Sequence, residues 1–209
     1  MSVITISRLY GSGGSEVAEL VAKELGWSLL DNAVIDAVAA RLGIPREEVA
    51  AREERVPSLS QRLADALRLG SQDWLAPLGE RAPTDEQLVE VTHRIVEEAI
   101  ARGPLVLVGR GAQEMLAQRA DALHVFCYAP RGALIERSMQ RDRLDEPAAA
   151  KRVDETNSHR EQWIRKHWNR SWREHSQYHL SVNTDWLGIA GAAELICFAA
   201  RKRFSIKPG

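Results

Sequence analysis

Five short apolar runs recur along the chain, separated by stretches with helical periodicity. Each run is four to six residues long, the length and composition of a strand that is buried on both faces of a parallel sheet. The runs are residues 3–7, 27–30, 105–108, 123–128 and 180–183. Since parallel strands need crossover connections, the alternation predicts a three-layer α/β domain with helices on both faces of the sheet.

The first run leads directly into a glycine-rich turn and a helix. The helical pattern ends at Gly26, a residue type that favours a helix C-terminus. A turn of this kind directs successive backbone N–H groups into one concavity and adds the positive end of a helix dipole. Strand, turn and helix together predict a phosphate-binding loop. Its residues are Gly11, Ser12, Gly13, Gly14, Ser15 and Glu16.

This loop lacks the lysine of the signature G-x-x-x-x-G-K-[ST], which binds the transferred phosphate. In that register Arg8 stands at the first glycine and Gly14 at the lysine. The Arg8 guanidinium could supply the missing cation, because it can fork onto two phosphate oxygens. Glu16 could contact magnesium directly or through water, or it could simply be a carboxylate favoured by the helix N-terminus. Close backbone packing is the alternative explanation for the glycines.

The pattern changes between Asp31 and Gly103, where more than seventy residues pass without a convincing strand. Helical periodicity recurs there over residues 32–42, 45–54, 60–69 and 84–102. We expect a helical insertion over about residues 32–103 that can close over a ligand, because such folds bind ligands beyond the carboxyl ends of their strands. A second helical region, about residues 131–173, precedes the fifth run. Residues 1–209 thus form a single domain with an insertion and a helical lid.

Two strand ends carry residues that suit an anionic ligand. Asp31 ends the second run, at the rim where such folds bind ligands, although an aspartate there is as often the cap of the next helix. Gly109-Arg110-Gly111 ends the third run. The two glycines let the backbone turn and hold the Arg110 guanidinium over the crevice, which favours a functional role over a surface charge.

The second helical region supplies further arginines. Arg137 and Arg141 are four residues apart and share one helix face, whereas Asn157 and Arg160, three apart, share another. Phosphoryl transfer needs positive charge around the migrating group, so arginines on a helical lid suit it. The alternative is a solvated basic face, balanced by the acidic residues Asp142, Asp145 and Glu146.

Residues 160–179 interleave aromatic and basic side chains, a composition that can bind single-stranded nucleic acid. Ile164, Trp168 and Trp172, however, fall at i, i+4 and i+8, which is the spacing of a buried helix face. We therefore expect these side chains to pack. The formal net charge of −1 also disfavours nucleic acid as a partner.

The composition, 209 residues of which 44% are hydrophobic and 27% charged, fits a globular protein with one sizeable core. No signal peptide opens the chain, and no apolar run approaches the roughly 20 residues that span a bilayer, so we expect a cytoplasmic protein without a membrane partner. Cys127 and Cys197 lie in apolar segments and are interpreted as small buried hydrophobes rather than a pair.

With these residues placed, the chain resembles the cytidylate-kinase-like branch of the P-loop nucleoside monophosphate kinases. The motifs run nearly end to end: residues 4–14, 30–32, 108–111, 137–141 and 178–184. The resemblance implies a P-loop NTPase-like fold with a five-stranded parallel sheet and a site for ATP and Mg²⁺ at the glycine loop. It also implies that an acceptor monophosphate binds under the inserted helices and that an arginine-rich lid closes over both nucleotides.

The motifs depart from those of cytidylate kinases at several positions. Those enzymes carry G-K-G-T where this chain has Gly13-Gly14-Ser15-Glu16, and G-R-D where it has Gly109-Arg110-Gly111. Of their motif D-T-G-x-x-Y-R only Asp31 is kept as a functional group, and of R-D-x-x-D-x-x-R only Asp154 and Arg160. Because packing depends on pattern, the fold follows more firmly than the activity.

Two hypotheses follow. In the first, the chain is a nucleotide kinase that moves the terminal phosphate of ATP onto a small phosphorylated acceptor such as CMP or dCMP. In the second, it is a nucleotide-binding regulatory protein that has lost transfer, since losing one electrostatic donor costs about two to three powers of ten in rate. Under the first, the acceptor-binding residues are Asp31, Arg110 and Asn157, and the catalytic residues are Arg137, Arg141 and Arg160.

Overall fold

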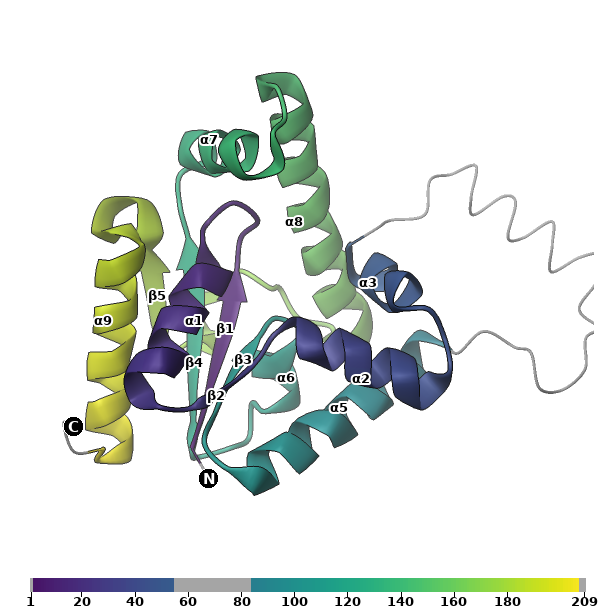
Figure 1. Cartoon of the computed structure of the whole chain (residues 1–209), viewed down its shortest axis with the longest axis vertical. Coiled ribbons are helices and arrows are strands. Elements are labelled where there is room, and N and C mark those ends of the chain that lie inside the picture. The colour runs from purple at the N-terminus through teal and green to yellow at the C-terminus, as the bar shows by residue number, and fades with distance from the viewer. Residues whose placement is uncertain (1, 55–83, 207–209) are drawn as a thin grey trace, which may run out of the picture.

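Five parallel strands form one sheet in the computed structural model, which describes residues 2–54 and 84–206. In the spatial order β2-β3-β1-β4-β5, β1 lies at the centre (Figure 1). The strands are β1 (Val3–Arg8), β2 (Ser28–Leu30), β3 (Leu105–Val108), β4 (Ala122–Tyr128) and β5 (Leu180–Asn183). All four pairings are parallel. The predicted fold class is confirmed, and each apolar run forms a strand close to its expected bounds.

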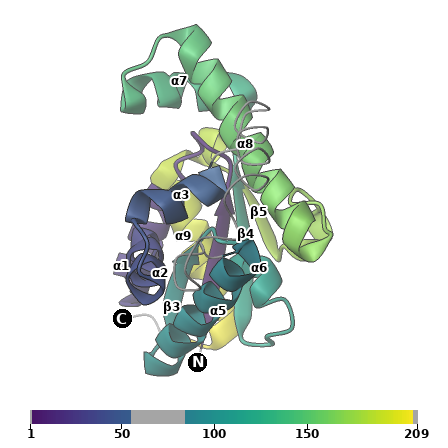
Figure 2. The ribbon, with the colours of Figure 1, turned by 90° about the vertical axis from the view of Figure 1, so that its right-hand side faces the viewer.

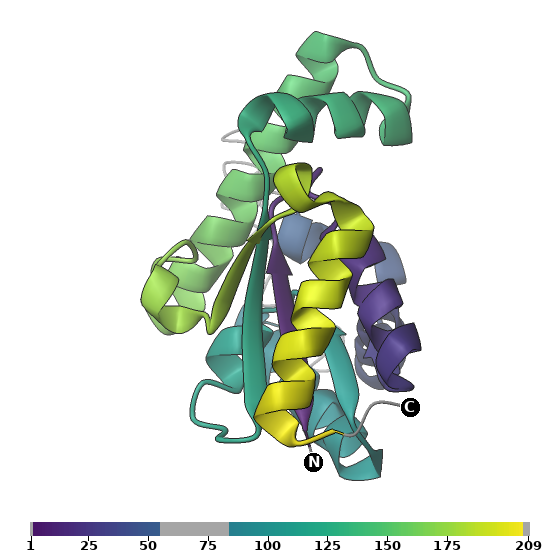
Figure 3. The same ribbon diagram turned by 90° about the vertical axis from the view of Figure 1, so that its left-hand side faces the viewer.

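Helices cover both faces of the sheet. Those of the described residues are α1 (Gly14–Leu25), α2 (Asn32–Leu42), α3 (Arg46–Glu54), α5 (Asp85–Arg102), α6 (Ala112–Met115), α7 (Arg131–Asp142), α8 (Glu146–Trp168) and α9 (Thr184–Phe204). Ile4 and Ile6 of β1 pack with α1 and α9 on one face (Figure 3). Val3 and Leu105 pack with α2, α5 and α6 on the other (Figure 2). Neighbouring residues of a strand therefore enter different halves of the core.

Two helices, α7 and α8, lie above the carboxyl ends of the strands, where the lid is expected (Figure 1). A third apolar cluster joins them to the turn between β1 and α1. In it, Leu9 and Tyr10 of the turn pack with Leu134 and Ile135 of α7 and with Val153 of α8. Because the turn and the lid share this core, polar side chains of both helices are held close to the glycine loop.

Helix ends follow the sequence signals with one exception. Gly26 ends α1 with a φ of 67°, in the left-handed region that glycine tolerates. The expected helix face through Trp168 and Trp172 is wrong in its last turn, because α8 ends at Trp168 and Asn169 adopts a φ of 54°. The signal is weak because asparagine replaces the usual glycine. The helix predicted over residues 60–69 lies outside the described residues.

Packing explains the aromatic stretch and both cysteines. Ile164 and Trp172 are buried, and Trp172 meets Phe126 edge to face with ring centroids 5.5 Å apart. Cys127 and Cys197 are free and buried, as predicted, and burial raises the pKa of both thiols to about 12. Neither thiol is therefore a nucleophile at neutral pH. Within the described ranges, no helix has the length and apolar character needed to cross a membrane.

Candidate nucleotide-binding site

Two glycines with left-handed backbone bend the turn between β1 and α1. Gly11 has a φ of 82°, and Gly13, the N-cap of α1, has a φ of 73°. A Cβ at Gly11 would collide with the carbonyl oxygen of Leu134 in α7, and one at Gly13 would collide with Ile189 of α9. Close packing thus accounts for part of this glycine pattern. The turn also places the N-terminus of a 12-residue helix at a cavity, an arrangement that suits an anion.

This cavity has a volume of about 280 Å³. The turn, the start of α1, the end of β2 and both lid helices form its walls. The polar and charged residues that line it are Arg8, Tyr10, Ser15, Glu16, Asp31, Arg141, Asp142 and Arg160. Three arginines from different parts of the chain therefore face one cavity beside a helix N-terminus, which favours a polyphosphate ligand.

Asp31 faces this cavity rather than capping the helix that follows it. It is the N-cap residue of α2, but its side chain makes no capping hydrogen bond. Its Oδ1 lies 3.6 Å from Arg8 Nη2, and the two side chains are 20% and 19% exposed. Of the two interpretations of Asp31 from the sequence, the helix cap is therefore not observed, and a role in the site stays a prediction.

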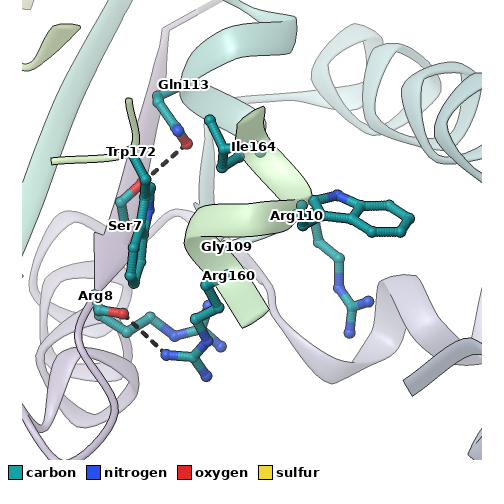
Figure 4. A pocket seen from close by; sticks show the side chains of 10 residues that line it. Ser7, Arg8, Gly109, Arg110, Gln113, Arg160, Ile164 and Trp172 are labelled. Atoms are coloured by element: carbon teal, nitrogen blue, oxygen red, sulfur yellow. Dashed lines mark hydrogen bonds between the residues drawn. The ribbon is translucent and has the colours of Figure 1, made fainter. Parts of the chain in front are cut away.

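Figure 4 shows the residues that line a second cavity, of about 30 Å³. Arg8 and Arg160 line both cavities and so form the wall between them. The remaining lining residues come from the ends of β1 and β3, α6, α8 and the segment after α8: Ser7, Gly109, Arg110, Gly111, Gln113, Trp163, Ile164 and Trp172. Ser7 Oγ donates a hydrogen bond of 2.9 Å to Gln113 Oε1. Arg110 therefore faces the second cavity, whereas the glycine loop lines the first.

The turn after β3 has three successive residues with positive φ. The values are 71° at Gly109, 61° at Arg110 and 64° at Gly111, and a non-glycine residue in this region is uncommon. The predicted turn at the strand end is therefore present. A Cβ at Gly111 would lie 2.5 Å from Cη2 of Trp168, so α8 packs directly on the backbone here.

Arg141 is held beside the loop by a carboxylate and an aromatic ring. Its Nε donates to Asp142 Oδ1 at 2.9 Å, and its guanidinium carbon lies 4.5 Å from the centroid of the Tyr10 ring. Tyr10 Oη donates to Asp142 Oδ2 at 2.7 Å, and Ser138 Oγ donates to the same oxygen at 2.9 Å. Burial opposes ionisation of Asp142, but these hydrogen bonds outweigh it and lower its pKa to about 2.

The other predicted lid residues hold the loop through hydrogen bonds. Arg160 Nη1 donates to the carbonyl oxygen of Arg8 at 2.9 Å, and Asn157 Oδ1 accepts from the Tyr10 amide at 2.8 Å. Arg137 donates to the Ser12 carbonyl oxygen at 3.2 Å and to the Thr184 carbonyl oxygen at 3.0 Å. Ser12 is fully buried and supports the loop from within. Arg137 faces a different cavity, about 400 Å³ in volume, which Gly11, Gly13, Glu16, Gln140 and Arg141 also line.

A family model covers this whole site. The model of the cytidylate kinase-like family matches residues 3–186, from β1 to the first turn of α9. The chain belongs to this family. No curated protein sequence matches it significantly.

Solved structures share the fold of this cytidylate kinase-like chain. A protein described as uncharacterized from Eubacterium ventriosum ATCC 27560 has 17% identity and a TM-score of 0.69, over 96% of this chain and 98% of that one. A gluconokinase from Sinorhizobium meliloti 1021 has 16% identity and a TM-score of 0.56, over 97% and 95%. A shikimate kinase from Bacteroides thetaiotaomicron has 12% identity and a TM-score of 0.52, over 98% and 99%. The chain therefore has the fold of small-molecule kinases with a phosphate-binding loop.

Ser15 and Glu16 are the groups of this cytidylate kinase-like chain that fit a magnesium ion. Ser15 directly follows Gly14, as Ser or Thr follows the lysine in the loop signature, and it lines the larger cavity together with Glu16. Magnesium usually takes one or two carboxylates, several waters and the phosphates of its nucleotide. Among the described residues, no group of three or more His, Cys, Asp or Glu side chains could hold a metal ion. The phosphates of the nucleotide and water would therefore supply most of the magnesium ligands.

Two residues of the site are not predicted from the sequence as functional groups. Tyr10 links the loop to both lid helices, and the Thr184 hydroxyl donates to the Ser12 carbonyl oxygen at 2.6 Å. Both residues lie within the motifs shared with cytidylate kinases, which was the available signal. Their roles depend on contacts over more than 120 positions of sequence, between Tyr10 and Asp142 and between Ser12 and Thr184, so periodicity cannot reveal them.

Proposed function

We propose that the chain is a nucleotide kinase that uses Mg²⁺ and ATP to phosphorylate a nucleoside monophosphate such as CMP or dCMP. The observation that carries the proposal is the cavity of about 280 Å³ at the glycine loop, which is the larger of the two that Arg8 and Arg160 line. A glycine loop at a helix N-terminus, the arginines Arg8, Arg141 and Arg160, and the carboxylate of Asp31 surround one space. The arginines and the helix N-terminus neutralise a triphosphate and the charge that spreads over the migrating group in the transition state.

The donor phosphates bind to the backbone N–H groups of the loop and of the first turn of α1. Ser15 and Glu16 would hold the magnesium ion, which would neutralise charge on the phosphate oxygens. An oxygen of the acceptor phosphate forms a bond to the γ-phosphorus. The bond from that phosphorus to the β–γ bridging oxygen breaks, and its electrons leave with ADP. Arg141 and Arg160 stabilise the negative charge on the transferred oxygens.

The acceptor extends from the smaller cavity, which Arg110 lines, toward Asp31, which lines the cavity at the glycine loop. Arg110 provides a fork for its phosphate, and the indoles of Trp163 and Trp172 offer flat apolar surfaces in the smaller cavity. Gly111 stands where cytidylate kinases have an aspartate, and Trp168 fills the adjacent space. Contacts to the acceptor base therefore differ from those in cytidylate kinases, and at about 30 Å³ the cavity must widen to admit a base. The acceptor is therefore identified by measuring turnover with each nucleoside monophosphate in turn.

The test is a coupled assay of ADP release from Mg-ATP with the ribo- and deoxyribonucleoside monophosphates, and with gluconate and shikimate as non-nucleotide acceptors. We expect turnover with at least one monophosphate, with CMP and dCMP as the first candidates. Arg160→Ala should lower kcat about 100- to 1,000-fold. Arg131→Ala is the matched control, because Arg131 pairs with Asp154 on the exposed face of α7 and α8. ADP release at background level with every acceptor would contradict the proposal.

A nucleotide-binding protein without transfer is the second candidate. The observation that favours it is the pairing of two cavity arginines with carboxylates of the same cavity, Arg8 with Asp31 and Arg141 with Asp142. Titration calorimetry with Mg-ATP distinguishes the candidates. Binding without turnover supports this second function, whereas turnover excludes it.

A further inference from the structure

We infer that Arg8 is a catalytic residue that takes the place of the missing loop lysine and contacts the phosphoryl group during transfer. The inference rests on the proposed function and adds to it the identity of the principal cation. In the loop signature the lysine stands at the position of Gly14, where α1 begins, whereas Arg8 is the last residue of β1. Its side chain nevertheless enters the same space.

The glycine at position 14 is explained by this side chain. A Cβ built on Gly14 would collide with Cβ of Arg8 and would lie 3.0 Å from its Cγ. In this backbone conformation, side chains at positions 8 and 14 therefore exclude each other, and a lysine at position 14 would need glycine at position 8. We interpret the two positions as exchanged: glycine stands where the signature has lysine, and the cation comes from Arg8 at the end of β1 instead of from the start of α1.

A second glycine makes room for the other end of Arg8. A Cβ on Gly109 would collide with Nη1 of the Arg8 guanidinium. Gly109 also has a φ of 71°, which favours glycine, and the absence of a side chain leaves room for the guanidinium in this position. Arg8 thus passes over two glycines that are 95 positions apart, one under its stem and one under its charged group.

The guanidinium lies at the boundary between the donor and the acceptor side. Arg8 lines both the larger and the smaller cavity (Figure 4). Its Nη2 lies 3.6 Å from Asp31, and its backbone oxygen accepts a hydrogen bond from Arg160. A phosphoryl group that moves from one cavity to the other passes this guanidinium. A solvent-accessible ion pair with Asp31 alone contributes little to stability and would not require two glycines around it.

Four variants test the inference: Arg8→Ala, Arg8→Lys, Gly14→Lys and the exchange Arg8→Gly/Gly14→Lys. Arg8→Ala should lower kcat about 100- to 1,000-fold while the KM for ATP changes by less than about 10-fold. Added guanidinium should restore part of this rate, and Arg8→Lys should lie between wild type and Arg8→Ala. Gly14→Lys should be inactive because of the collision. The exchange, in which glycine at position 8 removes the colliding Cβ and position 14 supplies a lysine, should be at least about 10-fold more active than Arg8→Ala.

The controls separate this inference from the proposed function. Arg131→Ala should behave as wild type, and melting temperatures show which variants fold. If wild type is active, an Arg8→Ala kcat within about threefold of wild type would overturn the role of Arg8. So would an exchange variant that folds and is no more active than Arg8→Ala. If wild type makes no ADP with any acceptor, the kinase proposal fails. The catalytic role of Arg8, which rests on that proposal, then fails with it.

Discussion

At the scale of single residues, Tyr10 connects the loop with the lid. Its amide donates a hydrogen bond to Asn157 of α8, its hydroxyl donates one to Asp142 of α7, and its ring makes a cation–π contact with the guanidinium of Arg141. Tyr10 is a positioning residue in this account, because the ring and the Asp142 carboxylate fix Arg141 at the mouth of the larger cavity. A fixed cation needs no reorganisation when charge develops.

Replacement of Tyr10 should therefore act through Arg141. We expect Tyr10→Leu to lower kcat about 10- to 100-fold, and Tyr10→Phe, which keeps the ring, to lower it less. In an Arg141→Ala background Tyr10→Leu should have little further effect, because both changes remove the same contact. The measurement is a double-mutant cycle in kcat, with the partly exposed Tyr128→Leu as the control. Effects that multiply independently would show that Tyr10 does not act through Arg141.

At the scale of elements, α8 fixes the acceptor side of the site by packing on the turn after β3. Trp168 lies on Gly111, and Ile164 and Trp163 complete the wall of the smaller cavity. The sequence predicts that this turn bends and that the indoles pack. It does not predict that they meet, since Gly111 and Trp168 are 57 positions apart and the helix stops at an asparagine.

This packing can be tested by restoring the aspartate of cytidylate kinases. Gly111→Asp should lower the free energy of unfolding by about 2 to 4 kcal/mol, because it adds a side chain at positive φ and against an indole. Trp168→Ala should remove the collision between the new side chain at position 111 and the indole. The free energy of unfolding of the double variant should therefore be higher than the sum of the two single effects predicts. Denaturant unfolding measures this coupling. Trp186→Ala, at an 82% exposed indole, should leave stability unchanged, and strictly additive effects at 111 and 168 would contradict the contact.

At the scale of the whole molecule, strand runs and loop position predict the fold because burial and crossover geometry act through local pattern. The convergence of Arg8, Asp31 and the lid arginines on one cavity follows from that fold, since carboxyl ends of parallel strands meet at one edge of the sheet. The route of each side chain does not follow. Only the packed structure shows that the Cβ and Cγ of Arg8 fill the space beside Gly14 and that Arg137 and Asn157 bind the loop.

The central claim is that the two cavities form one phosphoryl-transfer site. Its most direct test is to measure both products of the reaction together, by anion-exchange separation of a mixture of wild-type protein, Mg-ATP and a nucleoside monophosphate. The account predicts that ADP and the nucleoside diphosphate of the acceptor form at equal rates, and that both rates fall together in Arg160→Ala. ADP without phosphorylated acceptor, or neither product with any monophosphate, would contradict it.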